Sequence, residues 1–260
     1  GFDTRESVED VTHTLASYHA CVGARVFDHT VLERMAALDL VPVVTAMGLA
    51  TSRLGLGATY STTYYSPFHT ARLFASIDHF TKGRAAWNVV TSLNDSEAQN
   101  FGAAQHIGHG GRYDAAEEFM EASLALWCSW EKDALIGDKQ KGRFADPDKV
   151  HRVDYAGAHF QTRGPLTVPH SPQGYPVIIQ AGQSERGRQF AARWGELLFV
   201  IFPTSDACKA YRDEMRERST ASGRSPDSVK VAPAVYVVVG ESEDAANEKL
   251  QLIEDRKSVV

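Results

Sequence analysis

The amino-acid sequence predicts an α/β fold built on a parallel sheet. Strand-like apolar runs alternate with amphipathic helical runs, and about five strands can be counted in this order. The clearest unit joins a strand at 53–61, a helix that begins at Ser66-Pro67 and a strand at 83–92, because parallel strands require such a crossover. The length of 260 residues suits one large domain, as single α/β barrels reach about 250 residues. We therefore expect residues 1–260 to form a single domain.

The helices are predicted from the residues that start and stop them. Pro42 suits the first turn of one helix, and Ser66 suits the N-cap of the next, which Gly83 ends. A long helix from about Arg112 to Trp127 carries apolar residues at helical spacing. The remaining expected elements are a strand at 176–182, a helix opened by 183–187, a strand at 197–202, a helix that Ser205 caps and that ends near 222–223, a strand at 229–239 and a helix from Ser242.

Two segments between these elements lack clear periodicity. Residues 94–111 form a polar loop. Residues 128–175 are polar and rich in glycine and proline, and a segment of this length inside a domain is usually either an insertion that acts as an active-site lid or disordered. Within it we expect a small hairpin whose strands, 150–155 and 158–162, meet at a turn formed by Ala156-Gly157.

Composition and charge exclude several classes of partner. The formal net charge of −6 argues against a nucleic-acid or anionic-membrane partner attracted by bulk electrostatics. The 3 cysteines are scattered, which points to a reducing compartment, and we expect a cytoplasmic location. No apolar run of about 18 residues occurs, so we expect no membrane span. The histidines show no metal-ligand spacing, and we expect no metal site.

Asn88 interrupts an apolar strand and therefore needs an explanation. A buried amide that lacks a hydrogen-bond partner costs roughly 1–3 kcal/mol. Asn88 either bonds a neighbouring strand or water, or it faces a bound cofactor. Thr91 and Ser92 close the same strand, and ligands of parallel barrels lie at the carboxyl ends of the strands.

A second signal lies where the strand at 176–182 meets the next helix. Gly182 allows a tight turn, and Ser184 stands at the start of the helix, where unpaired backbone N–H groups and the helix dipole attract anions. The pattern indicates a phosphate-sized anion site or, equally well, an ordinary helix cap by Ser184. It is neither a dinucleotide-binding nor a Walker A motif.

His109 and Tyr113 lie one turn apart near the start of the long helix. Together they could hydrogen-bond a polar heterocycle or move a proton near neutral pH, or they could be a solvated histidine and a half-buried tyrosine. Thr59, Asn88 and the segment Ala181 to Ser184 all lie at strand ends, which share one rim in a barrel. A phosphorylated planar cofactor across that rim would satisfy them together.

Several motifs resemble one known family. They are the runs 57–65, 87–92, 100–102 and 109–113, the segment 164–166, and 172–174 leading into 180–184. In this order they are similar to the bacterial luciferase-like flavin monooxygenases and, more narrowly, to the nitrilotriacetate, EDTA and dibenzothiophene-sulfone monooxygenase branch. The resemblance covers most of the chain from about Leu40 to Val239.

The resemblance implies a (β/α)8 TIM barrel of the luciferase-like type. It implies a two-component monooxygenase that takes reduced FMN (FMNH2) from a separate NAD(P)H-dependent flavin reductase. The flavin would activate O2 as a C4a-hydroperoxide and oxygenate a small organic substrate such as an aminopolycarboxylate or a sulfone. An acidic substrate would need cationic contacts, for which Arg112, Arg143, Arg152 and Arg163 are candidates. We also expect a homo-oligomer, a dimer or a tetramer.

The same resemblance implies roles for individual residues. Those expected to bind the flavin are Thr59, Asn88, His109 and Tyr113 for the ring and ribityl chain, and Ala181, Gly182 and Ser184 for the phosphate end. Asn88 and His109 are the candidate catalytic residues, because both would position the ring and the peroxide, and His109 is the candidate for proton transfer.

Three questions stay open at the level of sequence. Full family members have two strands before the position of Pro42 and one after that of Val239, and neither residues 1–40 nor the segment after Val239 shows them clearly. Whether the barrel is complete in this chain is therefore undecided. The alternative functions are a deazaflavin-dependent hydride-transfer oxidoreductase and a flavin-binding protein without turnover.

Overall fold

The computed structural model describes residues 40–92, 94–235 and 237–257. Its centre is a five-stranded sheet of order β1-β2-β7-β8-β9. The strands are β1 (Leu56–Ser61), β2 (Ala85–Val90), β7 (Val177–Gln180), β8 (Leu197–Val200) and β9 (Lys230–Pro233). Every neighbouring pair is parallel, as the alternation of strands and helices predicts. The weakly periodic segment 1–39 lies outside the described residues.

The strand register fixes which side chains share a face of the sheet. Thr59 of β1 is paired with Asn88 of β2, and Asn88 is paired with Ile179 of β7. Paired residues of neighbouring strands point to the same face, and the next residue along each strand points to the other. Asn88 and its neighbour Trp87 therefore lie on opposite faces of β2.

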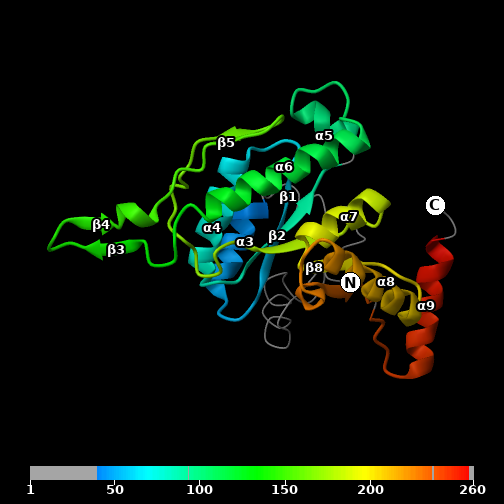
Figure 1. The fold of residues 1–260 in the computed structure, drawn as a ribbon. Coiled ribbons are helices and arrows are strands. Elements are labelled where there is room, and N and C mark those ends of the chain that lie inside the picture. Colours follow the sequence, from blue (N-terminus) through cyan, green and yellow to red (C-terminus); the bar gives the residue numbers. More distant parts are fainter. Residues whose placement is uncertain (1–39, 93, 236, 258–260) are drawn as a thin grey trace.

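Helices cover the Trp87 face of the sheet (Figure 1). The α-helices of the described residues are α3 (Leu40–Ala50), α4 (Pro67–Thr81), α5 (Asp95–Asn100), α6 (His109–Trp127), α7 (Glu185–Trp194), α8 (Ser205–Ala221) and α9 (Glu243–Lys257), of which α4 and α6 pack on β2. The Trp87 ring is fully buried between Phe74 of α4 and Phe119 of α6, with ring centroids 5.6 and 5.8 Å away. The Trp127 ring also packs against Trp87, with their ring centroids 6.2 Å apart. The predicted apolar stripe of the long helix thus forms the core.

Most of the predicted helix ends agree with the structure. Ser66 caps α4 by accepting a hydrogen bond from the His69 N–H at 3.3 Å, and Gly83 follows the helix with a φ of +81°. Ser184 caps α7, so the helix-cap alternative of the sequence analysis is confirmed. The cap of α8 is Thr204 rather than Ser205, because the Thr204 hydroxyl accepts from the Ala207 N–H.

Three sequence expectations are wrong in detail. The polar loop 94–111 contains the short helix α5, whose first turn carries acidic residues that suit its dipole, and α6 begins at His109, three residues before Arg112. The last strand of the sheet is short, since β9 ends at Pro233, whose ring nitrogen has no hydrogen to donate. The described residues of 234–239 are in no strand.

The insertion 128–175 is built from two small hairpins. β3 (Leu135–Asp138) and β4 (Arg143–Ala145), which the periodicity does not indicate, project away from the sheet, as Figure 1 shows. β5 (Tyr155–Ala156) pairs with β6 (Gln161–Thr162), so the expected hairpin exists but turns at 157–160 rather than at Ala156-Gly157. The remaining short elements are the 3-10 helices η1 (Pro147–Lys149) and η2 (Pro226–Ser228). That 128–175 acts as a lid stays a prediction.

The turn of the second hairpin shifts because α6 holds it. The Glu118 carboxylate on α6 accepts hydrogen bonds from three successive backbone N–H groups, those of residues 158–160. These bonds lower the pKa of the Glu118 carboxyl, since they favour its charged form. Among the described residues, no helix is both long enough and apolar enough to cross a membrane.

Candidate functional site

The strongest candidate site lies at the carboxyl ends of β1, β2 and β7. Asn88 donates a hydrogen bond from its side-chain nitrogen to the Thr59 hydroxyl at 2.9 Å. The side-chain oxygen of Asn88 is buried and has no hydrogen-bond partner among the described residues. A bond to the neighbouring strand therefore accounts for the side-chain nitrogen of Asn88 but not for its side-chain oxygen. An N–H donor of a bound ligand would fit the Asn88 oxygen.

The ends of β1 and β2 are cross-linked beyond the regular strand pairing. The Thr62 N–H donates to the Val90 carbonyl at 2.9 Å, and the Thr63 hydroxyl donates to the Thr91 carbonyl at 2.8 Å. One residue later, the Ser92 backbone adopts a left-handed conformation with a φ of +57°. A non-glycine residue held in this region costs about 1–3 kcal/mol and is frequent at functional sites.

The second part of the site is the start of α7, next to the end of β7. The Ser184 hydroxyl accepts a hydrogen bond from the Gly187 N–H at 3.1 Å. The Gly182 N–H donates to the Gln180 side-chain oxygen at 2.6 Å. Because β2 and β7 are neighbours in the sheet, this turn follows the same edge on which Asn88 lies. These two N–H groups are engaged within the turn, and the helix N-terminus beside them is the feature of the type that binds phosphate.

Tyr113 of α6 lies directly over this turn. A Cβ atom added at Gly182 would come within 2.8 Å of the Tyr113 hydroxyl, and one added at Gly187 within 2.9 Å. Both positions therefore require glycine while the phenol stays in place. Tyr113 is 6% exposed, so it is more deeply buried than the half-buried alternative assumes.

Charges around the start of α7 are arranged so that they do not repel an anion. Glu185, the first residue of the helix, is hydrogen-bonded by the Arg218 guanidinium at 2.8 and 2.9 Å, which lowers the pKa of the Glu185 carboxyl. Arg218 thus offsets the negative charge that Glu185 brings to the site. Arg186 points to α6 instead, where it pairs with Asp114 at 2.9 Å.

The structure arranges most of the predicted site residues in two groups. Thr59 is joined to Asn88, and Tyr113 lies against Gly182 and the turn that Ser184 caps. Ala181 is exposed between these partners. His109 is the first residue of α6, but its side chain lies outside the described part of the chain, so its expected role stays a prediction.

Sequence reasoning missed Gln180 and Gly187. Gln180 reads as the polar end of a strand, and its bond to the Gly182 N–H depends on the fold of the turn. Gly187 lies in the first turn of a helix, where glycine is unfavourable by roughly 0.5–1 kcal/mol relative to alanine. A glycine at this unfavourable position was the available signal that another group, here the Tyr113 hydroxyl, approaches the backbone closely.

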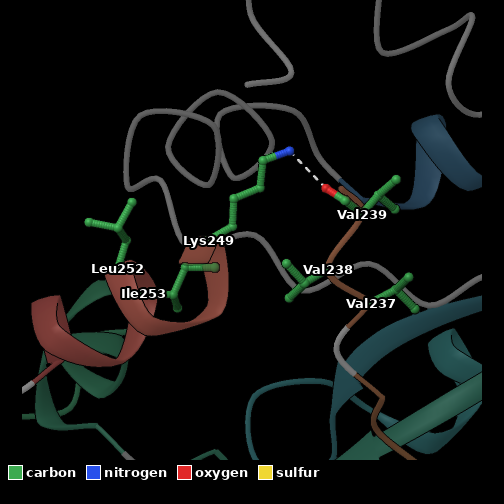
Figure 2. A pocket seen from close by; sticks show the side chains of 6 residues that line it. All are labelled: Val237, Val238, Val239, Lys249, Leu252 and Ile253. Atoms are coloured by element: carbon green, nitrogen blue, oxygen red, sulfur yellow. Dashed lines mark hydrogen bonds between the residues drawn. The ribbon is translucent and has the colours of Figure 1, made fainter. Parts of the chain in front are cut away.

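One hollow among the described residues lies elsewhere. It has a volume of about 380 Å³ and is lined by Val237, Val238, Val239, Lys249, Leu252 and Ile253, whose side chains Figure 2 shows. The Lys249 ammonium donates to the Val239 carbonyl at 2.8 Å. The groove contains none of the predicted site residues, and its lining offers no group for acid–base or redox chemistry beyond this engaged lysine.

Comparisons with known proteins relate this chain to known monooxygenases. A sequence model of the family described as "Luciferase-like monooxygenase" matches residues 18–258. The chain is 52% identical over 217 residues to a dibenzothiophene-sulfone monooxygenase of Rhodococcus erythropolis, covering 84% of this chain and 48% of that protein. It is 44% identical to nitrilotriacetate monooxygenase component A of Aminobacter aminovorans, covering 83% of this chain and 48% of that protein.

A solved structure shows the same fold. The crystal structure of a riboflavin lyase with modified FMN and riboflavin is 39% identical to this chain and matches with a TM-score of 0.79, over 91% of this chain and 53% of that one. The predicted luciferase-like fold class is therefore confirmed, and the described strands form an open parallel sheet of that type. The chain spans about half the length of the curated relatives it matches. It belongs to the luciferase-like monooxygenase family.

Proposed function

We propose that this chain supplies the flavin site of an FMNH2- and O2-dependent monooxygenase. The observation that carries the proposal is the pairing of two features on one sheet edge. These are the unpartnered Asn88 oxygen and the glycine turn beneath Tyr113. The first fits a ring N–H group and the second fits a phosphate, which are the two ends of FMN. The family membership and the FMN-containing relative support the same cofactor.

Bound reduced FMN would supply the reaction with O2, and the protein would bind, orient and shield it. Asn88 would orient the ring through its side-chain oxygen, and Thr59 fixes the amide by accepting from its nitrogen. Gly182, Ser184 and Tyr113 would hold the phosphate, with Ala181 next to them. His109 at the start of α6 is our candidate for proton transfer.

The proposed partners follow from the same family. A separate NAD(P)H-dependent flavin reductase would supply FMNH2, and the relative named as a component A supports such a division of labour. The substrate would be a small organic molecule of the sulfone or aminopolycarboxylate type. Of the candidate contacts for an acidic substrate, Arg112 is buried and Arg152 is paired with Asp154 at 2.7 Å, whereas Arg143 and Arg163 are exposed. We also propose a homo-oligomer in the cytoplasm.

Titration of the full-length protein with oxidised and enzymatically reduced FMN tests the cofactor. We expect saturable binding of both, with Ser184→Ala weakening FMN binding by about 3- to 10-fold, because it removes a helix cap worth about 1 kcal/mol at the phosphate end. The affinity for riboflavin, which has no phosphate, should not change. No binding by the wild-type protein would refute the proposal.

A panel of sulfones and aminopolycarboxylates, supplied with reduced FMN and isotope-labelled O2, tests the reaction. We expect one labelled oxygen atom in the product. Anaerobic turnover with a deazaflavin would establish hydride transfer instead. FMN binding with no labelled product from any substrate would favour a flavin-binding protein without turnover.

A further inference from the structure

Arg112 is a buried cation with an unusual set of partners. It is 7% exposed, and its guanidinium donates to the Ser92 backbone carbonyl at 2.5 Å. The Nε–H group is buried and has no hydrogen-bond partner, and no carboxylate forms an ion pair with Arg112 among the residues that the structure describes. Buried charges in proteins are normally paired with an opposite charge. A buried arginine that instead donates to a backbone carbonyl therefore needs an explanation.

The acceptor of Arg112 is the residue with the left-handed backbone. Ser92 is held by two further contacts, since its hydroxyl lies 2.8 Å from the Ser61 hydroxyl and donates to the Glu97 carboxylate at 2.7 Å. A strained conformation of this kind persists only where its surroundings over-determine it. Ser61, Glu97 and Arg112 are those surroundings, and they fix the corner that follows Asn88 and Thr91.

The residue next to Arg112 reaches the other part of the site. Arg112 and Tyr113 are consecutive in the first two turns of α6, so their side chains leave the helix about 100° apart. Arg112 contacts the end of β2, and the Tyr113 hydroxyl lies over Gly182 and Gly187 at the start of α7. The first turns of α6 therefore connect the Asn88 part of the site to the phosphate part.

We propose that Arg112 is a positioning residue that sets the separation between the two ends of the flavin site. This inference rests on the proposed function. By holding the Ser92 carbonyl, Arg112 fixes the distance between the Asn88 oxygen and the phosphate turn. FMN can then contact the Asn88 oxygen and the phosphate turn at the same time without a rearrangement of the protein. Its phosphate therefore contributes its full share of the binding free energy. Lysine cannot replace it, because an ammonium lacks the planar fork that reaches a buried carbonyl with a fixed geometry.

The chain offers a matched control in Arg84. This arginine also serves backbone carbonyls, donating to those of Gly48 and Thr51 at 2.8 Å. It lies immediately before β2, at the amino end of the sheet, whereas Arg112 serves the carboxyl end. Arg84→Lys should therefore disturb the fold at the end away from the site.

The test measures the affinities of the full-length protein for FMN and for riboflavin, with thermal unfolding of each variant. The quantity of interest is the ratio obtained when the dissociation constant for riboflavin is divided by that for FMN, which reports how much the phosphate contributes to the affinity. We expect Arg112→Lys to lower this ratio by about 10-fold or more, because a small misplacement of the positioned groups typically costs 10- to 100-fold. Glu97→Gln, which replaces the charge-assisted hydrogen bond from Ser92 by a weaker neutral one and leaves the buried arginine in place, should lower the ratio in the same direction by a smaller factor.

Arg84→Lys should lower the unfolding temperature and leave the ratio unchanged. If Arg112→Lys and Glu97→Gln behave like Arg84→Lys, Arg112 is only a structural residue and the inference is wrong. If the wild-type protein binds neither flavin, the proposed function itself fails. If Arg112→Lys does not fold, an unchanged ratio in Glu97→Gln is sufficient to overturn the inference.

Discussion

Trp87 and Asn88 are neighbours on β2, yet their side chains differ in packing and in hydrogen bonding. Trp87 faces the helices, where its ring is fully buried and its Nε1–H donates to the Tyr60 carbonyl at 3.0 Å. Asn88 faces the other side of the sheet, where one of its two polar atoms is buried without a partner among the described residues. On the packed face the polar atom of Trp87 is hydrogen-bonded, whereas on the other face the described residues leave the Asn88 oxygen, which we propose faces the flavin, without a partner. Stability and binding should therefore respond to different substitutions on the same strand.

The largest effect is expected on the packed face. Trp87→Ala removes a fully buried ring that contacts Phe74, Phe119 and Trp127, and such truncations cost about 3–5 kcal/mol through lost burial and the cavity left behind. Equilibrium unfolding in urea measures the loss. If Trp87→Ala proves as stable as the wild-type protein, the helices do not cover this face in the way described.

A large effect on binding is expected from Gly182→Ala. The new methyl group would lie 2.8 Å from the Tyr113 hydroxyl and 2.6 Å from the Gln180 amide nitrogen, so one of them must move and the phosphate turn opens. We expect FMN to bind about 10- to 100-fold more weakly, as judged by flavin fluorescence titration.

Gly110→Ala is the matched control for this glycine. Gly110 lies in the first turn of α6, and nothing lies within 4 Å of the position that its Cβ would take. Alanine should stabilise the protein by about 0.4–1 kcal/mol and leave FMN binding unchanged. Equal weakening of FMN binding by both substitutions would mean that the turn at Gly182 has no special role.

Asn88→Ala should separate binding from stability most clearly. The substitution loses the hydrogen bond to Thr59, worth about 0.5–1.5 kcal/mol, and removes an unpaired oxygen whose burial costs about 1–3 kcal/mol. The two terms offset each other, so the free energy of unfolding should change by less than about 1 kcal/mol. FMN affinity should fall by about 10-fold, the equivalent of one lost hydrogen bond. A clear loss of stability with unchanged FMN affinity would make Asn88 a structural residue.

These contrasts explain which features could be predicted from the sequence. Asn88 and Ser184 could be singled out because each breaks or closes a local pattern, and local patterns are what a sequence displays. The role of Arg112 could not, because it depends on a carbonyl 20 residues away whose position follows from the fold. The turn of the second hairpin was misplaced for the same reason, since Glu118 on a distant helix decides where it forms.

Local signals also failed where competing ones were present. Ser205 and Thr204 are both good capping residues, and only the geometry of the preceding loop makes Thr204 the cap. The short helix α5 buries little apolar surface, with Ala98 as its buried residue, so it leaves no periodic pattern. The fold class depended on none of these details, because alternating strands and helices with one clear βαβ unit define it.

The smallest effect is expected in the insertion, away from both faces of β2. Burial and a hydrogen bond to the Glu121 carboxylate at 3.0 Å raise the pKa of Tyr155 from 10.0 to about 12. Because the folded pKa lies above the unfolded one, the protonated phenol stabilises the fold fully below pH 10, and this contribution is lost as the pH rises from 10 to about 12. Tyr155→Phe should therefore flatten the fall of stability in that range, as thermal unfolding at a series of pH values would show. FMN affinity at neutral pH should stay unchanged in this variant, since the bond joins the hairpin to the outer part of α6. A weaker affinity would instead mean that 128–175 closes over the flavin, which is the expectation for a lid, and the insertion would then belong with the binding face rather than apart from it.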